Sequence, residues 1–284
     1  MNDILEKKRI NSVERVDQFS ANLDGNAELE NMDGLGIFVS GSYARNEASI
    51  FSDIDLFFVL DGKLQEIDDA NLKSMRAFSK VIEIADKMEF PTFSNDGEFL
   101  KILEKDEILT ELGGRNDDHS NYFTARMLLL LESKPVYGEA VYNKVLKKVI
   151  EAYFRDYKHH PRDFKPTFLI NDIIRFWKTL CLNYEHKRNQ INVTDIQKTK
   201  QKIKNLKLKF SRMLTCYGTI AAVIDMGGQA GPKEIMSLRT KTPLERLGSA
   251  VKDKPVLEQD FAILAEKYRW FLELTNVSEN ELGV

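Results

Sequence analysis

Two aspartates separated by one residue, Asp53 and Asp55, have the spacing in this 284-residue sequence that most strongly suggests chemistry. Side chains two apart in a strand lie on the same face, so both carboxylates would share one small volume while Ile54 and Leu56 face the core. Two carboxylates this close repel each other unless a divalent cation neutralises them. Mg²⁺ prefers such oxygen ligands, usually in company with phosphates. The pair therefore predicts a magnesium site for a phosphorylated ligand.

A glycine-serine bend precedes the acidic pair and could complete a phosphate site. Gly41 would let the backbone turn tightly and approach a phosphate, while Ser42 and neighbouring amides could donate to the β- and γ-phosphate oxygens. Ser52 stands directly before the first aspartate. Bend and acids together indicate a site that holds a nucleotide and its metal ions.

Two short hydrophobic runs would position these residues. The run 35–39 predicts a strand that ends at the bend, and the run 53–60 predicts a second buried strand that ends at Asp61-Gly62. A helix is expected over about 69–87, followed by a weaker strand candidate over 98–103.

Long amphipathic patterns replace strand-like runs from about residue 121 onward. Two helices are expected over 125–157, divided near Lys134-Pro135, and another over 168–187. A further helix carries an apolar stripe that ends near Tyr217, and Thr194-Asp195 precede it as caps. We therefore expect an α+β fold, with a small head of mixed β-sheet and flanking helices at 1–120 and a helical bundle domain at 121–284.

Composition excludes several classes of protein. The charges of the 41 basic and 44 acidic side chains nearly cancel, so the chain lacks the large net positive charge that is typical of nucleic-acid-binding proteins. Cys181 and Cys216 lack metal-ligand spacing and are expected to be reduced core residues of a cytoplasmic protein. No apolar run approaches the roughly 18 residues of a membrane span. P-loop, G-x-S-x-G and G-x-G-x-x-G motifs are missing, which argues against Walker-type, hydrolase and Rossmann sites.

The segment GSYARNEASIFSDIDL resembles the signature G-S-x-A-R-G-x-A-x-x-x-S-D-I-D-L of polymerase β-type nucleotidyltransferases. Its one departure is Asn46 in place of glycine, and asparagine tolerates positive φ better than most residues. The chain also resembles nucleotidyltransferases related to the amino-terminal region of the PII uridylyltransferase, which join such a head to a helical substrate-binding domain. The resemblance implies the same division of labour between 1–120 and 121–284.

The resemblance also implies a mechanism. Asp53 and Asp55 would coordinate two Mg²⁺ ions. One ion would be bound to the triphosphate, and the other would lower the pKa of the attacking hydroxyl. In-line attack on the α-phosphate would then release pyrophosphate, with ATP as the nucleotide most frequent among relatives. The family usually adds a third carboxylate from a later strand, for which Glu98 is preferred and Asp96 is the substitute.

Several cations could contact the phosphates. Arg45 could bind phosphate or brace the loop through carboxylate pairing. Arg175 and Lys178 share one face of a helix that resembles the one beside the triphosphate in relatives, and Lys178 is favoured over Arg175. An ordinary amphipathic helix with solvated cations explains these two equally well. The lysine-rich segment 198–209 could meet a polyanion, but a solvated helix face is the favoured interpretation.

The sequence thus predicts transfer of a nucleoside monophosphate from an NTP to an acceptor hydroxyl, such as a hydroxyl on a protein. A small molecule, an RNA end or another nucleotide are the alternative acceptors. A non-catalytic regulatory module that binds nucleotide is the alternative from another class, and the intact acidic pair argues against it. The acceptor itself would be selected by the helical body.

Overall fold

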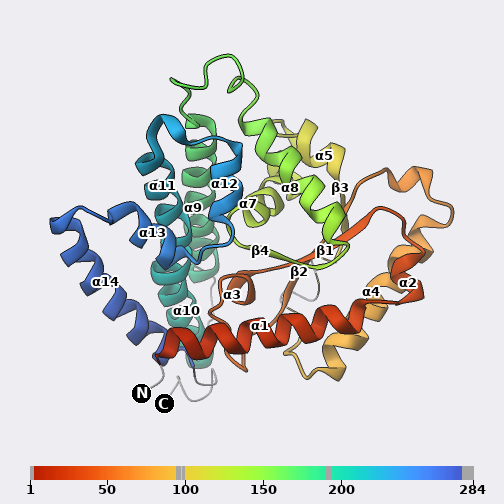
Figure 1. Cartoon of the computed structure of the whole chain (residues 1–284). Helices are drawn as coiled ribbons and strands as arrows, with labels where there is room; N and C mark the ends of the chain where they lie inside the picture. Colours follow the sequence, from red (N-terminus) through yellow and green to blue (C-terminus); the bar gives the residue numbers. More distant parts are fainter. Residues whose placement is uncertain (1–2, 94–96, 98–99, 190–193, 277–284) are drawn as a thin grey trace. The chain divides into compact units, whose positions relative to one another are not determined.

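A computed structural model describes residues 3–93, 97, 100–189 and 194–276 (Figure 1). The chain forms two compact units, Met1–Ala152 and Tyr153–Val284. The elements of the first unit are α1 (Ile4–Leu23), α2 (Ala27–Glu30), β1 (Leu35–Ser40), α3 (Gly41–Ala44), β2 (Asp55–Leu60), α4 (Ala70–Lys87), β3 (Ile102–Glu104), α5 (Lys105–Thr110), α6 (Asn116–His119), α7 (Tyr122–Leu131), β4 (Ser133–Tyr137) and α8 (Glu139–Tyr153).

The first unit is built on a mixed sheet, as predicted, and the sheet has four strands. The strand order is β3-β2-β1-β4. β1 pairs antiparallel with both β2 and β4, whereas β2 and β3 run parallel. In the central pair, Leu35 lies opposite Leu60 and Ser40 lies opposite Asp55. The end of β1 and the start of β2 therefore meet at one edge of the sheet.

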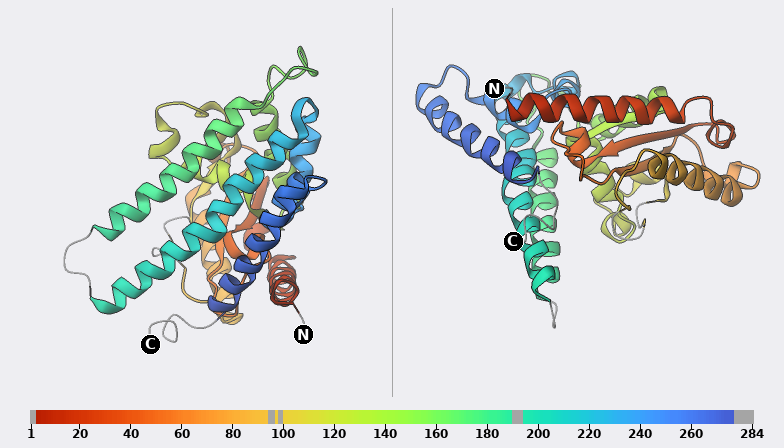
Figure 2. Two further views of the ribbon diagram at one scale, coloured as in Figure 1. Left: turned by 90° about the vertical axis from the view of Figure 1, so that its left-hand side faces the viewer. Right: turned by 90° about the horizontal axis from the view of Figure 1, so that it is seen from below.

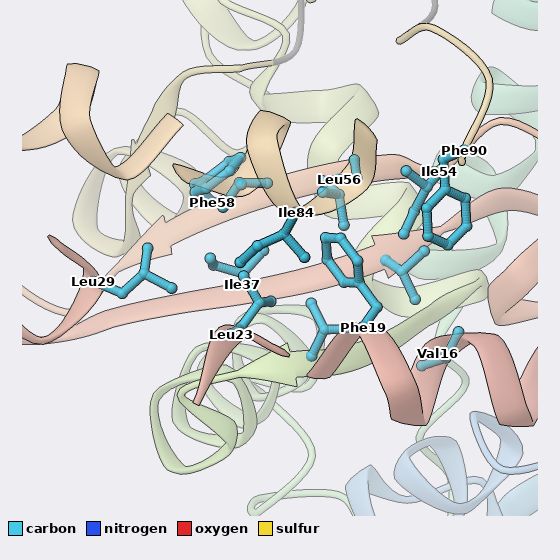
Figure 3. Packing of buried hydrophobic residues seen from close by; sticks show 14 of the residues in the cluster. Val16, Phe19, Leu23, Leu29, Ile37, Ile54, Leu56, Phe58, Ile84 and Phe90 are labelled. Carbon is cyan, nitrogen blue, oxygen red and sulfur yellow. The ribbon is translucent and has the colours of Figure 1, made fainter. Parts of the chain in front are cut away.

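One face of the sheet packs against α1 and α4. Strand residues Ile37, Leu56 and Phe58 meet Phe19 of α1 and Ile84 of α4 in a single buried cluster (Figure 3). In α1 the buried positions recur at three- and four-residue steps, and the last three of them, Val16, Phe19 and Leu23, form the apolar part of this face. This cluster is the core that fixes β1 and β2 relative to each other.

The opposite face of the sheet is covered in part by α8. Phe38 and Phe57 are cross-strand partners whose rings stack with centroids 5.2 Å apart. Tyr142 of α8 packs against Phe38, with 5.9 Å between ring centroids. Gly36 allows α8 to lie close to β1, since a Cβ at this position would lie 3.2 Å from the backbone nitrogen of Tyr142. Asp55 belongs to this second face, because it alternates with the core residues of β2.

The chain after residue 121 is mostly helical as expected, but one strand was missed, because β4 (Ser133–Tyr137) separates α7 from α8 and pairs with β1. Pro135 ends the helical pattern as predicted, but the residues around it are extended. β4 is an edge strand, where a residue without an N–H group is tolerated. Because β4 belongs to the sheet, the compact unit reaches Ala152, whereas the sequence predicted a boundary after residue 120.

The second unit is helical in its described part. Its helices are α9 (Thr167–Arg188), α10 (Asp195–Lys207), α11 (Met213–Met226), α12 (Pro232–Leu238), α13 (Pro243–Val251) and α14 (Pro255–Leu274). α9 lies beside α10 and α11, which run the opposite way and are joined by a π-helical turn, Leu208–Arg212 (Figure 2). Thr194 caps α10 through a capping box with Gln197, so the predicted cap is confirmed.

The two cysteines are free thiols, as expected. Cys216 is buried and Cys181 is half-buried, and neither forms a disulfide. A search of the described residues found no helix with both the length and the apolar character needed to cross a lipid bilayer.

Candidate active site

The bend after β1 lies directly against a carboxylate. α3 begins at Gly41, whose φ is +70°, a left-handed conformation that favours glycine. A Cβ at this position would lie 2.8 Å from Oδ2 of Asp55. The cross-strand pairing of Ser40 with Asp55 explains this approach, because it aligns the end of β1 with the start of β2. The structure thus brings together the bend and the second aspartate.

The first aspartate stands before β2 rather than in it, since the strand begins at Asp55 and not at residue 53 as expected. The alternation of burial nevertheless extends over both acids. Ile54 and Leu56 are buried at 1% and 2% exposure, whereas Asp53 and Asp55 are half-buried. In an extended segment this pattern directs both carboxylates away from the core.

Tyr43 connects the bend to Asp53 and to α1. Its ring is buried and packs edge to face on Phe90, with centroids 5.5 Å apart. The guanidinium of Arg15 lies 4.2 Å from the centroid of the same Phe90 ring and hydrogen-bonds the Tyr43 hydroxyl. Burial raises the pKa of Tyr43, and the nearby Asp53 carboxylate acts in the same direction, while Arg15 opposes both. Sequence analysis missed Tyr43 and Arg15, because Tyr43 fills a variable position of the motif and Arg15 lies in a helix without a motif.

Ser52 stabilises the turn that delivers Asp53. Its hydroxyl accepts from the backbone N–H of Ser49 at 3.0 Å, and its carbonyl accepts from the Tyr43 hydroxyl at 3.4 Å. The Ser49 hydroxyl in turn accepts from the N–H of Phe51 at 3.2 Å. These bonds give Ser52 a positioning role in the structure. Ser42, also predicted to bind phosphate, lies in α3 and is half-buried.

Arg45 points into the protein. Its Nε lies 2.8 Å from Glu47 and its Nη1 lies 2.6 Å from Glu132, which caps α7. The Arg45 side chain is only 7% exposed, so the ion pairs are shielded from water. Of the two predicted roles, this geometry supports bracing, because Arg45 ties the loop after α3 to the end of α7.

Asn46 adopts the left-handed conformation that its place in the motif requires, with φ of 63°. Its side-chain oxygen accepts a hydrogen bond from Lys134 of β4. Burial lowers the pKa of Lys134 to about 8, against the opposing attraction of the Asp17 carboxylate. The departure of the motif from glycine is therefore accommodated, as expected for asparagine.

Comparison with protein families places these residues in a known domain. Residues 24–125 match the model of the nucleotidyltransferase domain, and the match contains the bend and both aspartates. This segment is similar to the nucleotidyltransferase domains of the polymerase β type. Searches of curated proteins and of solved structures returned no match to the chain.

The position of the predicted third carboxylate is not among the described residues. Glu98 and its substitute Asp96 both lie outside the described residues. The strand expected over 98–103 is described as β3, Ile102–Glu104, which runs parallel to β2. The described residues contain no cluster of three or more histidine, cysteine, aspartate or glutamate side chains that could hold a metal ion.

The two predicted phosphate-binding cations belong to the second unit rather than to the nucleotidyltransferase domain. Both lie on α9, as expected. Arg175 lies 3.5 Å from Asp172 and is 34% exposed, whereas Lys178 is exposed. Asp172 also accepts a hydrogen bond of 2.6 Å from Tyr153. A role of Arg175 and Lys178 at the triphosphate therefore stays a prediction.

Asp53 and Asp55 have the chemistry that a divalent cation requires. Carboxylate oxygens are hard ligands, and Mg²⁺ is commonly held by one or two carboxylates with substrate phosphates completing the shell. A Cβ at Gly41 would lie 2.8 Å from Oδ2 of Asp55, so the glycine is what lets this carboxylate lie against the bend. The chemistry of these donors and their place against the bend therefore fit a magnesium ion bound together with a triphosphate.

Proposed function

We propose that this protein transfers a nucleoside monophosphate from an NTP to an acceptor hydroxyl in a magnesium-dependent reaction. The observation that carries the proposal is the close approach of the Asp55 carboxylate to Gly41, where a Cβ would lie 2.8 Å from Oδ2, within the segment that matches the nucleotidyltransferase domain. This approach supports the proposal, because the amides of the bend and a carboxylate that binds the metal ion would both serve one metal-bound triphosphate. ATP is the proposed nucleotide.

Asp53 and Asp55 would hold the two magnesium ions, which when bound neutralise phosphate charge and increase the acidity of the acceptor hydroxyl. The first N–H groups of α3 have no intrahelical acceptor, so those near Gly41 and Ser42 are suited to donate to phosphate oxygens. The acceptor oxygen attacks the α-phosphorus, the bond to the β-phosphate oxygen breaks, and pyrophosphate leaves. The chain contributes mainly position and charge, as in other phosphoryl transfers.

A hydroxyl on a protein is the proposed acceptor. The support is the sequence resemblance to nucleotidyltransferases of the PII uridylyltransferase type, in which a helical domain follows the head. We propose that the helical second unit selects the acceptor in the same way. Two free cysteines support a reducing compartment such as the cytoplasm as its location.

The test uses each α-³²P-labelled NTP with Mg²⁺ and a cell lysate. The wild type should release pyrophosphate and move label into protein, while Asp53→Asn and Asp55→Asn should each lower the rate by about a hundredfold or more. Asp33→Asn is the matched control, because Asp33 is an exposed aspartate of the same domain. Label in RNA or in a small molecule would reassign the acceptor. Equal behaviour of the wild type and both site variants would overturn the proposed activity.

A further inference from the structure

A pocket of about 270 Å³ lies within the second unit, outside the matched domain. Its walls come from α11, α13, α14 and the π-helical turn Leu208–Arg212. Apolar and aromatic side chains form most of the lining, including Phe210, Met213, Tyr217 and Tyr268. Neither the acidic pair nor the bend of the first unit contributes to it. The pocket therefore offers a function separate from the proposed transfer.

The pocket walls are held in place by contacts that do not depend on a ligand. Phe210 stacks on Phe271 with 4.8 Å between ring centroids, and the Tyr268 hydroxyl donates to Ser211 at 3.3 Å. Phe210 belongs to the π-helical turn, and such turns recur at functional sites in proteins. Gly218 allows α11 to approach α13 closely, since a Cβ there would lie 2.9 Å from the carbonyl oxygen of Pro243. Preformed apolar pockets of this kind are typical small-molecule sites.

The size of the pocket limits its ligand. A dry cavity of roughly 150 Å³ is enough to hold a benzene molecule. At about 270 Å³ this pocket is large enough for a body of about two fused rings, or for an aliphatic group of equal volume. Its aromatic walls favour a flat, aromatic body, because rings pair well with rings.

The charge of the pocket selects the polar part of the ligand. Lys209 and Lys267 are the two charged residues among the described residues that line it, and no carboxylate accompanies them there. Both lysines are exposed, and since an exposed lysine keeps its ammonium group in water while its stem covers apolar surface, we expect both charges at the rim. Lys209 is also the last lysine of the segment 198–209. The pocket thus combines an apolar interior with a positive rim.

We propose that this pocket binds a small molecule with an aromatic body of about two rings and one anionic group. The rings would fill the space between Phe210, Tyr217 and Tyr268. The anionic group would lie at the rim, within reach of Lys209 and Lys267.

The test compares two probes of nearly equal shape by isothermal titration calorimetry on the full chain. 1-Naphthaleneacetate carries the anion, and 1-naphthaleneacetamide is its neutral counterpart. The wild type should bind one equivalent of each, the acetate about fivefold tighter, since one charge pair in water contributes about this factor. Lys209→Glu with Lys267→Glu should weaken the acetate at least about tenfold and leave the amide within about twofold.

A pocket-filling variant and a control complete the design. Met213→Trp, at a lining position that is 40% exposed, should weaken both probes at least about tenfold by occupying the space. Lys202→Glu with Lys204→Glu, two exposed lysines of α10 outside the lining, should leave both probes within about twofold. A circular dichroism melt checks that each variant is folded. The proposal fails if the wild type binds neither probe, if Met213→Trp binds as the wild type does, or if both charge-reversed pairs behave alike.

Discussion

Replacing Gly41 by alanine should impair the active site far more than it impairs folding. The added Cβ would lie 2.8 Å from Oδ2 of Asp55, whereas ordinary contact begins at 3.4 Å. The carboxylate must therefore move by about 0.6 Å, which a side-chain terminus can do without disturbing the strand. The backbone at φ of +70° adds a strain of about 1–2 kcal/mol for any residue with a Cβ.

Gly25→Ala is the matched control for this prediction. Gly25 has φ of +68°, but a Cβ there would meet no atom within 4 Å. Both variants should thus lose about 1–2 kcal/mol of unfolding free energy, measured by urea denaturation. Only Gly41→Ala should displace the carboxylate of Asp55, which we propose binds the metal ion.

Two assays measure the displacement. Mn²⁺ binding followed by electron paramagnetic resonance should weaken by about 10- to 100-fold in Gly41→Ala, the range found when the support of a metal ligand is lost. Pyrophosphate release should fall by a similar factor, because a misplacement of 1 Å can lower a rate by about a hundredfold. Gly25→Ala should match the wild type in both. If Gly41→Ala binds Mn²⁺ as tightly as Gly25→Ala, the inferred contact between bend and carboxylate does not shape the metal site.

Three further predictions concern buried charges of the first unit. Arg45→Met leaves the buried Glu132 carboxylate without its guanidinium partner and should lower the unfolding free energy by about 3–5 kcal/mol in urea, and a loss under about 1 kcal/mol would refute the bracing role. Arg126→Met should lower the unfolding free energy by a similar amount, because Arg126 donates two hydrogen bonds of 2.9 and 2.7 Å to the fully buried Asp117. The double variant Arg126→Met with Asp117→Leu should lose less unfolding free energy, because no buried charge is left unpaired. Lys134 has its folded pKa lowered to about 8, so the unfolded chain binds more protons between about pH 8 and 10 and stability should rise with pH in that window. That rise should reach about 1–2 kcal/mol by about pH 9.5 after allowance for partial exposure, and it should be missing in Lys134→Gln.

The local parts of the site were predictable because they depend on residues close together in the chain. A glycine followed by serine after a hydrophobic run predicted the bend, and alternation around Ile54 predicted the shared direction of the two aspartates. Asn46 at φ of 63° and the cap of α10 by Thr194 also follow from local backbone chemistry. The strands of the first part and the mostly helical second part followed from the periods of the apolar residues.

Tertiary structure decided what depends on distant partners. From the sequence alone, Arg45 could either bind phosphate or brace the loop. The ion pair with Glu132, a residue far along the chain, supports bracing. The segment around Pro135 was read as a break between helices, because its strand character comes from pairing with β1 and not from its own residues. Tyr43, Arg15 and Asp53 meet only once α1 packs on the sheet. A sequence records which side chains are available, whereas burial and pairing across the fold determine which of them meet.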